Sequence, residues 1–293
     1  AETTIKDHLK KDSFSADDLN AIQSDDPKVN EAKGLLLFLK SNNLDLEGAM
    51  DYQKYLADQV NYHYNLDFDD RAILGDDPDD LSDTDYGNAN VIGPDKKEAD
   101  HGTHVSGIIA AKRNNGVGID GIANNVEIMA IRAVPNGDEY DKDVALAIRY
   151  AVDNGAQIIN TSFGKGYSPQ KEWVTEAIQY AAKKDVLIIN AAGNDSKNID
   201  LEDNPIYPND QLGGVSVSNS FLTVGALASE YGGEMVSSFS NYGKENVDVF
   251  APGSDVWSCK PNNEYDFASG TSMAAPAVSG VAALVRSYFP KLT

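Results

Sequence analysis

A serine and a histidine that lie far apart in the sequence each begin an apolar helical pattern. Ser272 lies within residues 270–276 (GTSMAAP), and His101 opens residues 101–104 (HGTH). A hydroxyl at a helix start lies near the positive end of the helix dipole. A serine becomes a strong nucleophile when a neighbouring base takes its proton, and histidine commonly serves as that base. The two segments therefore supply a serine and a histidine of the kind that nucleophilic catalysis combines.

Each of these residues also has a structural interpretation when it is taken alone. A serine after a glycine is a common helix cap. His101 and His104 have the spacing of a metal-binding pair, but no third ligand with suitable spacing is found among the four histidines. Asn194 stands in a glycine-containing turn after an apolar run, where asparagine is a frequent turn residue.

The elements that must position these residues alternate between short apolar runs and amphipathic helical patterns. This alternation predicts an α/β fold, with right-handed crossovers and a mostly parallel sheet covered on both faces. In such sheets, ligands bind outside the carboxyl ends of the strands, where His101, Ser162, Asn194 and Ser272 fall. We expect strands at 126–134, 157–161, 186–192, 221–226 and 247–250, and helices at 141–154, 169–184 and 271–289.

The first part of the chain has a different sequence pattern, which is helical and contains no glycine-rich strands. A capping-box pattern begins at Ser15, a second helical segment begins at Pro27, and a third covers residues 46–62. We therefore expect a small helical insertion or subdomain over residues 1–62, followed by the main domain over residues 63–293.

Composition excludes several classes of function. The net charge of −22 argues against nucleic acids and anionic membranes as partners, since both need a basic surface. Cys259 is the sole cysteine, which excludes an intramolecular disulfide and any multi-cysteine zinc site. The apolar runs are too short to span a membrane.

Three segments in order, residues 101–104, 191–195 (AAGND) and 270–276, resemble the subtilisin-like serine peptidases (peptidase family S8). Residues 237–241 (SSFSN) and 250–253 (FAPG) match the same pattern, so the resemblance spans about residues 87–293. It implies a three-layer αβα fold and peptide-bond hydrolysis through an acyl-enzyme. It further implies that Ser272 is the nucleophile and His101 the general base. Asn194 and the Ser272 backbone N–H would hold the oxyanion.

The resemblance also implies where a protein or peptide substrate binds. Ser162, Phe163 and Gly164 would form one edge of the substrate groove, against which an extended peptide adds as a strand. Asn136 and Gly137 would form the facing edge, and Gly193 belongs to the wall beside the scissile bond. Because these walls are small or apolar, we expect a preference for a large, uncharged side chain next to that bond.

The aspartate of the family's triad ends an apolar strand before the histidine, and no segment of this chain matches that pattern. Asp67 is the nearest internal candidate, but it lacks the apolar run and the following glycine. We expect the true strand to precede Ala1 and the peptidase domain to be incomplete at both ends. The alternative is an inactive peptide-binding module that keeps the groove. A third idea, an acidic calcium-dependent adhesion module, does not account for Ser272.

The expectations for metal binding and for the cellular location of the protein rest on weaker sequence patterns. Nine aspartates lie between residues 67 and 85, which indicates a solvated acidic loop or, alternatively, a calcium loop without EF-hand spacing. The family's calcium loop corresponds to residues 112–120, so a structural calcium ion is expected as an option, whereas the chemistry requires no cofactor. Residues 1–7 are not a signal peptide. By resemblance, we expect a secreted or cell-envelope protein.

Overall fold

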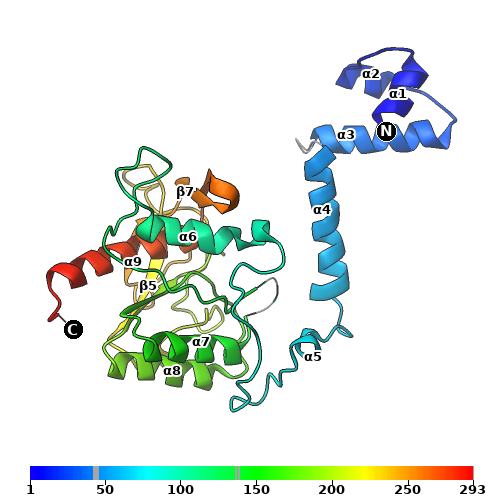
Figure 1. Ribbon diagram of the computed structural model, residues 1–293. Helices are drawn as coiled ribbons and strands as arrows, with labels where there is room; N and C mark the ends of the chain where they lie inside the picture. Colours follow the sequence, from blue (N-terminus) through cyan, green and yellow to red (C-terminus); the bar gives the residue numbers. More distant parts are fainter. Residues whose placement is uncertain (42–45, 136, 138, 293) are drawn as a thin grey trace. The chain divides into compact units, whose positions relative to one another are not determined.

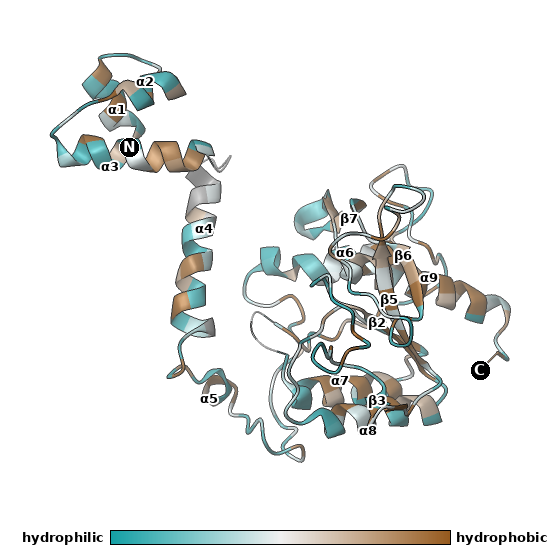
Figure 2. Ribbon diagram, turned by 180° about the vertical axis from the view of Figure 1, so that it is seen from behind, coloured by the Kyte–Doolittle hydropathy of each residue, from teal (hydrophilic) through white to brown (hydrophobic). Residues whose placement is uncertain are grey.

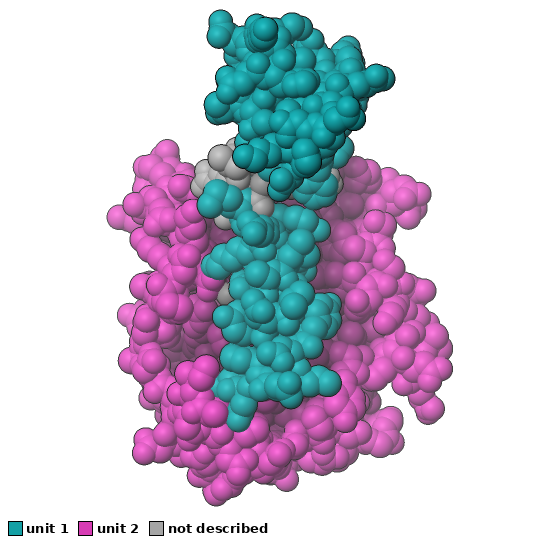
Figure 3. All heavy atoms as spheres, turned by 90° about the vertical axis from the view of Figure 1, so that its right-hand side faces the viewer, with its two compact units in different colours: residues 1–70 teal, residues 71–293 magenta. Residues whose placement is uncertain are grey.

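The computed structural model describes residues 1–41, 46–135, 137 and 139–292. The chain divides into two compact units, Ala1–Asp70 and Arg71–Thr293, which are coloured separately in Figure 3. The helical block predicted for residues 1–62 falls within the first unit. The predicted domain boundary between residues 62 and 63 stays a prediction.

The first unit is helical and has its own small core. Ser15 Oγ accepts a hydrogen bond from the Asp18 backbone N–H at 3.1 Å, and the Asp18 carboxylate accepts one from the Ser15 N–H at 2.8 Å. This reciprocal pair is the predicted capping box. Ile5, Leu19 and Val29 are buried together in the core. The elements are α1 (Glu2–Leu9), α2 (Ala16–Ala21), α3 (Pro27–Ser41), α4 (Leu46–Asp58) and a π-helical turn (Gln59–His63).

The second unit is built on a parallel sheet with strand order β1-β2-β5-β6 (Figure 1). These strands are β1 (Ile158–Thr161), β2 (Leu187–Ala191), β5 (Phe221–Leu227) and β6 (Val249–Pro252). Two antiparallel pairs lie outside this sheet, β3 (Gln211–Leu212) with β4 (Val215–Ser216), and β7 (Val256–Lys260) with β8 (Glu264–Ala268). The helices are α5 (Asp70–Leu74), α6 (Asp100–Ala110), α7 (Asp141–Asp153), α8 (Lys171–Lys183) and α9 (Thr271–Tyr288), with 3₁₀ turns at Lys96–Ala99 and Pro261–Asn263.

Alternate side chains of each strand face opposite layers, as the period of a strand requires. Ile188 of β2 packs in the cluster formed with α7 and α8, while Ile189 packs against α9. In Figure 1, α7 and α8 lie on one side of the sheet, and α6 and α9 lie on the other. Figure 2 colours β5 as largely hydrophobic, as a strand buried between two layers should be. The predicted three-layer αβα fold is confirmed.

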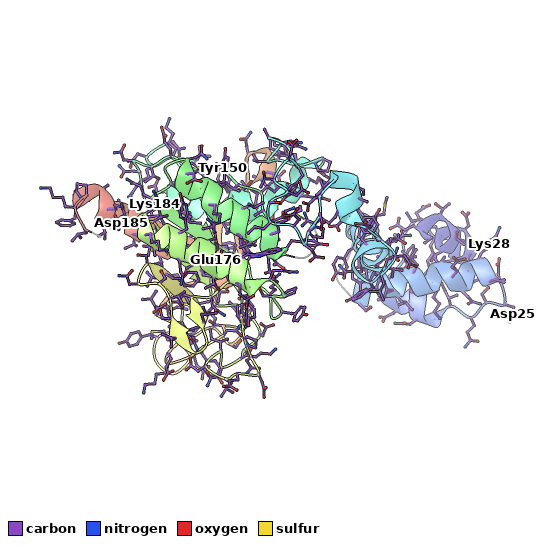
Figure 4. The ribbon with its side chains drawn as sticks, turned by 90° about the horizontal axis from the view of Figure 1, so that it is seen from below. Asp25, Lys28, Tyr150, Glu176, Lys184 and Asp185 are labelled. Carbon is purple, nitrogen blue, oxygen red and sulfur yellow. The ribbon has the colours of Figure 1, made fainter. Side chains whose placement is uncertain are left out.

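The outer surfaces of the two crossover helices α7 and α8 are polar. Glu176 of α8 pairs with Arg149 of α7 at 3.8 Å, and the Arg149 guanidinium also lies over the Tyr180 ring (Figure 4). Asp185, just after α8, accepts a hydrogen bond from Arg286 near the end of α9 at 2.6 Å. The side of each helix that faces the sheet is apolar, so both are amphipathic as predicted.

The strand predicted over residues 126–134 is wrong. These residues are irregular, and the apolar side chains Ile128, Met129 and Ile131 are exposed. A strand is stable only when a neighbour takes up its backbone hydrogen bonds. In the part of the chain that the structure describes, no strand pairs with residues 126–134. Their high β propensity is therefore not sufficient to form a strand.

The acidic segment after residue 70 is held by a buried cluster of charges rather than being solvated throughout. Lys142 is 1% exposed, and its ammonium group pairs with the fully buried carboxylate of Asp76. It also donates to the Asp77 carbonyl at 2.7 Å and lies over the Tyr86 ring. Arg71 Nη1 donates to the same Asp76 carboxylate at 2.9 Å. These contacts fasten the segment to the start of α7.

We expect Lys142→Met to lower the free energy of unfolding by about 3–5 kcal/mol, because it leaves Asp76 buried with less compensation for its charge. Urea unfolding of the variant and the parent protein measures the difference. Lys6→Met is the matched control, since Lys6 and Glu2 form an exposed pair at 3.8 Å that contributes about 0–1 kcal/mol. Equal losses in the two variants would contradict the prediction.

No described helix is long and apolar enough to cross a membrane.

Candidate active site

The predicted site residues gather along one groove of about 1920 Å³ in the second unit. His101, Asn194 and Ser272 line it together, although they come from three separate segments. Four of the predicted substrate-binding residues, Ser162, Phe163, Gly164 and Gly193, also line this groove. Gly137 is exposed and is not among the lining residues, and Asn136 lies outside the described residues.

Ser272 stands in the first turn of α9, next to the carboxyl end of β1. Its hydroxyl donates a hydrogen bond to the Ser162 carbonyl oxygen at 3.1 Å. The Ser162 hydroxyl donates in return to the Ser272 carbonyl oxygen at 2.9 Å. The start of the helix is therefore held against the segment that follows β1, with the Ser272 side chain partly exposed to the groove.

A chain of side-chain hydrogen bonds extends this contact along α9. Asn160 of β1 donates to Ser162 Oγ at 2.8 Å and accepts from Ser279 Oγ at 2.9 Å. Ser279 lies two turns beyond Ser272 on the same helix. We call Asn160, Ser162, Ser272 and Ser279 the serine relay. It fixes both the position and the rotation of α9 relative to β1.

Asn194 is oriented by Thr271, the residue before Ser272. The Thr271 backbone N–H donates to Asn194 Oδ1 at 2.9 Å, and the Thr271 hydroxyl donates to the same oxygen at 3.0 Å. A backbone N–H can only donate, so the amide oxygen of Asn194 must face Thr271. The Nδ2 group of Asn194 therefore faces away from Thr271, with its donors available.

Gly270 keeps open the space between the two expected oxyanion donors. A Cβ atom added at this glycine would lie 3.5 Å from Asn194 Nδ2 and 3.7 Å from the Ser272 backbone nitrogen. The two nitrogens thus border one small space beside Gly270. Gly270 also has φ +156°, which L side chains rarely adopt. The arrangement can place two N–H donors on one oxygen atom.

His101 lies in the first turn of α6. Helices α6 and α9 pack through Val105 and Ile108 against Met273, which places the starts of both helices beside the groove. Desolvation of the imidazole where it lines the groove lowers the pKa of His101, and the nearby His104 shifts it in the same direction. The imidazole is therefore neutral at neutral pH, which is the form that accepts a proton. No hydrogen bond joins His101 to Ser272 among the described residues.

His104 is buried and has a packing role. It is 1% exposed, and its Nε2 atom lies 3.2 Å from the Asp266 carbonyl oxygen. In the described part of the chain, no group of three or more His, Cys, Asp or Glu residues is arranged to hold a metal ion. In the predicted calcium loop, the Asp120 carboxylate accepts from the Asn114 N–H at 2.9 Å. Calcium binding there stays a prediction.

No carboxylate bonds to His101 within the described residues. Asp100 is its neighbour in sequence, but the Asp100 carboxylate pairs with Lys260 at 2.6 Å. The internal candidate Asp67 belongs to the first unit. In the part of the chain that the structure describes, the predicted nucleophile, base and oxyanion donors thus line one groove, and no carboxylate is bonded to His101.

One long side of the groove is an unpaired strand edge. Strand β1 pairs only with β2 in the part of the chain that the structure describes, and Ile158, Ile159 and Asn160 line the groove from that edge. Residues 126–135 line the groove as well. The groove is thus bounded by a free parallel edge and an exposed apolar segment.

Two residues that position the site were not recognised in the sequence. Thr271 is 1% exposed and anchors Asn194, and Asn241 is fully buried and bonds to the loop that carries Asn194. Both stand inside segments singled out by resemblance, residues 270–276 and 237–241. The motifs therefore contained both residues, but the sequence does not show which loop their side chains contact.

Residues 37–293 match the model of the Subtilase family. A thermophilic serine proteinase from Bacillus sp. (strain AK1) is 42% identical over 188 residues, covering 64% of this chain and 42% of the relative. A cell wall-associated protease from Bacillus subtilis (strain 168) is 39% identical over 213 residues, covering 71% and 22%. The crystal structure of a cold adapted subtilisin-like serine proteinase superposes with a TM-score of 0.55 at 34% identity, covering 66% of this chain and 63% of that one.

The chain spans less than two thirds of the length of each of these relatives. The family model covers most of the chain, and His101, Asn194 and Ser272 line one groove. This chain belongs to the Subtilase family, peptidase family S8.

Proposed function

We propose that this chain carries most of the catalytic machinery of a serine endopeptidase. Ser272 Oγ attacks the substrate carbonyl carbon, and His101 takes the hydroxyl proton and delivers it to the leaving amine. Water then hydrolyses the acyl-enzyme with His101 again as the base. The observation that carries this proposal is the shared groove, in which the Thr271 hydrogen bonds aim Asn194 beside the start of α9.

Asn194 Nδ2 and the Ser272 backbone N–H hold the negative oxygen of the tetrahedral intermediate. Their placement around the space that Gly270 leaves open supports this role. One such donor contributes roughly 2.7–4 kcal/mol to transition-state stabilisation, a magnitude that was measured on subtilisin itself. The Ser272 hydroxyl must leave the Ser162 carbonyl and turn to His101, and such tightening on substrate binding is common.

The aspartate of the triad comes, in this proposal, from an extended apolar strand that fills the groove beside β1. The unpaired edge of β1 and the exposed side chains Ile128, Met129 and Ile131 support this placement. A strand parallel to β1 would end at the same edge of the sheet as Ser162 and Asn194. Its last residues would thus approach His101, whose tautomer the carboxylate would fix.

Labelling with a fluorophosphonate tests the proposal, because this reagent reacts with an activated serine. The complete gene product, incubated at neutral pH, should carry one adduct, which peptide mass spectrometry should map to Ser272. Heat-unfolded protein is the control and should remain unlabelled. An absence of adduct, under conditions that label a known relative, would falsify the proposed nucleophile.

The second candidate function is a catalytically inactive peptide-binding module on the same fold. The absence of a carboxylate bonded to His101 among the described residues favours it. The two functions separate in one assay with a labelled peptide. The enzyme releases cleaved product, whereas the module binds the peptide with an affinity that is independent of Ser272 reactivity.

The wall next to the scissile bond supports a preference for uncharged side chains. A Cβ atom at Gly164 would lie 3.4 Å from Ile206 Cγ2, and one at Gly193 would lie 3.6 Å from Ile206 Cδ1. Ile206 therefore lies between these two glycines and presents an apolar surface. The Asp195 carboxylate is 3.4 Å from Asn241 Nδ2, so it already has a partner.

We expect Ile206→Ala to raise kcat/KM for a peptide with Phe next to the scissile bond, relative to one with Ala, by roughly tenfold. The smaller side chain leaves room for the ring, and hydrophobic pockets discriminate by about 1–3 kcal/mol per methylene. Steady-state kinetics on the two peptides measures the ratio. Leu201→Ala, at an exposed position, is the control. A profile dominated by Lys or Arg would contradict an uncharged preference.

The location and the calcium requirement remain parts of the proposal. A secreted or cell-envelope enzyme should be recovered from the medium or the wall fraction rather than from the cytosol. A structural calcium ion should raise the thermal midpoint of unfolding, and chelation should lower it.

A further inference from the structure

Asn241 is buried directly behind the loop that carries Asn194. Its side chain is 0% exposed, and the residue is not among those that line the groove. It therefore touches neither the substrate nor Ser272. The hydrogen bonds of its side chain are nevertheless all directed at residues 192–197, on both sides of Asn194.

The side-chain amide of Asn241 bonds to the loop at four points. Nδ2 donates to the Ala192 carbonyl at 2.8 Å and to the Asp195 carboxylate at 3.4 Å. Oδ1 accepts from the backbone N–H groups of Asp195 and Lys197, each at 3.0 Å. Residues 192–197 belong to neither a helix nor a strand, so their backbone groups lack the partners that such elements supply. The Asn241 amide provides those partners instead.

The backbone of Asn241 completes this contact. Its N–H donates to the Gly193 carbonyl at 2.9 Å. Gly193 has φ +94°, and a Cβ atom there would lie 2.5 Å from Asn241 Nδ2. Any side chain at residue 193 would therefore push the amide of Asn241 away from the loop. The glycine and the asparagine fit each other, and together they set the path of the chain into Asn194.

We propose that Asn241 is a positioning residue, which holds the loop so that Asn194 Nδ2 meets the oxyanion. Thr271 fixes the rotation of the Asn194 amide, and Asn241 fixes the backbone from which this side chain projects. This inference rests on the proposed function, because it assigns a role in the oxyanion site. A displacement of about 1 Å in a catalytic group can lower the rate about 100-fold.

The test is a double-mutant cycle on the complete gene product with a chromogenic peptide. We expect Asn241→Ala to lower kcat about 100-fold with little change in KM, and Asn194→Ala to lower kcat about 100- to 1000-fold. The double variant should be about as slow as Asn194→Ala alone. Once the Asn194 donor has been removed, displacing the loop that carries it cannot lower kcat further. If the two losses multiply instead, Asn241 acts on general stability and the inference is wrong.

Two further variants keep the result clear. Asn241→Asp keeps an acceptor for the N–H groups of Asp195 and Lys197, loses the donor bonds to Ala192 and Asp195, and sets a carboxylate against that of Asp195, so its kcat should fall at least as far as that of Asn241→Ala. It serves as the test if Asn241→Ala does not fold. Ser237→Ala is the matched control, because this buried hydroxyl bonds to Ser254 and not to the loop. Its kcat should be unchanged, and a loss as large as that of Asn241→Ala would overturn the inference.

The outcomes separate the two proposals. If Asn194→Ala leaves kcat unchanged, the proposed oxyanion site fails. If Asn194→Ala is slow and both Asn241 variants match the parent, only the positioning role fails.

Discussion

Ser272→Ala should lower kcat of the complete gene product by roughly a million-fold, the size of the loss in subtilisin itself when its serine is replaced. Without Ser272 Oγ, no acyl-enzyme can form, and the base and oxyanion donors have no nucleophile to assist. Initial rates on a chromogenic peptide, with a long incubation for the variant, measure the ratio.

Folding and substrate binding should be retained, because Ser272 contributes one hydroxyl bond to the Ser162 carbonyl and its backbone contacts remain. Ser287→Ala, on the same helix, is the control and should keep the parent rate, since its hydroxyl bonds only to the Leu284 carbonyl. A Ser272→Ala protein that retains even a hundredth of the parent rate would exclude this serine as the nucleophile.

The second large effect concerns the strand that we propose for the groove. Residues 1–293 expressed alone should hydrolyse peptide about 10,000-fold more slowly than the complete gene product, because none of the described carboxylates is bonded to His101 to fix its tautomer. The isolated chain should also aggregate, since Ile128, Met129 and Ile131 are exposed and the edge of β1 is unpaired. Initial rates and light scattering of the two proteins measure both effects.

Comparable rates in the two proteins would instead place the aspartate within residues 1–293. Asp67→Asn and Asp69→Asn would then be the first variants to make, with Asp25→Asn as the control. Under our proposal all three variants of the complete gene product keep the parent rate. A loss of about 10,000-fold in Asp67→Asn alone would identify this residue as the third triad member.

The sequence predicted the sheet because the amphipathic helices α7 and α8 stand on either side of β1 in the sequence, and short apolar runs mark the strands that follow. Strands β2 and β5 were found within a residue or two, since both are buried on two faces and read as continuous apolar runs. The failure at residues 126–134 has the opposite cause. That segment has the composition of a strand, but composition cannot report whether a neighbouring strand is present.

The candidate site was predicted from motifs, because the positions of these motifs in the sheet bring them together. His101, Asn194 and Ser272 stand at helix starts or strand ends, where a parallel sheet gathers side chains from distant segments. Asn241 could not be assigned a role in this way. Its function depends on a tertiary contact between two loops separated by more than forty residues, and no local pattern reports that contact.

Through the serine relay, the position of the Ser272 hydroxyl depends on the position of β1, whose outer edge is unpaired among the described residues. Because Asn160 holds both Ser162 and Ser279, any shift of β1 moves α9 and with it Ser272. Docking of a new strand on β1 would therefore align the hydroxyl at the moment when the sheet is completed. While the edge of β1 is open, α9 rests on a strand that has a neighbour on one side alone, so the Ser272 hydroxyl is held less firmly than in a completed sheet.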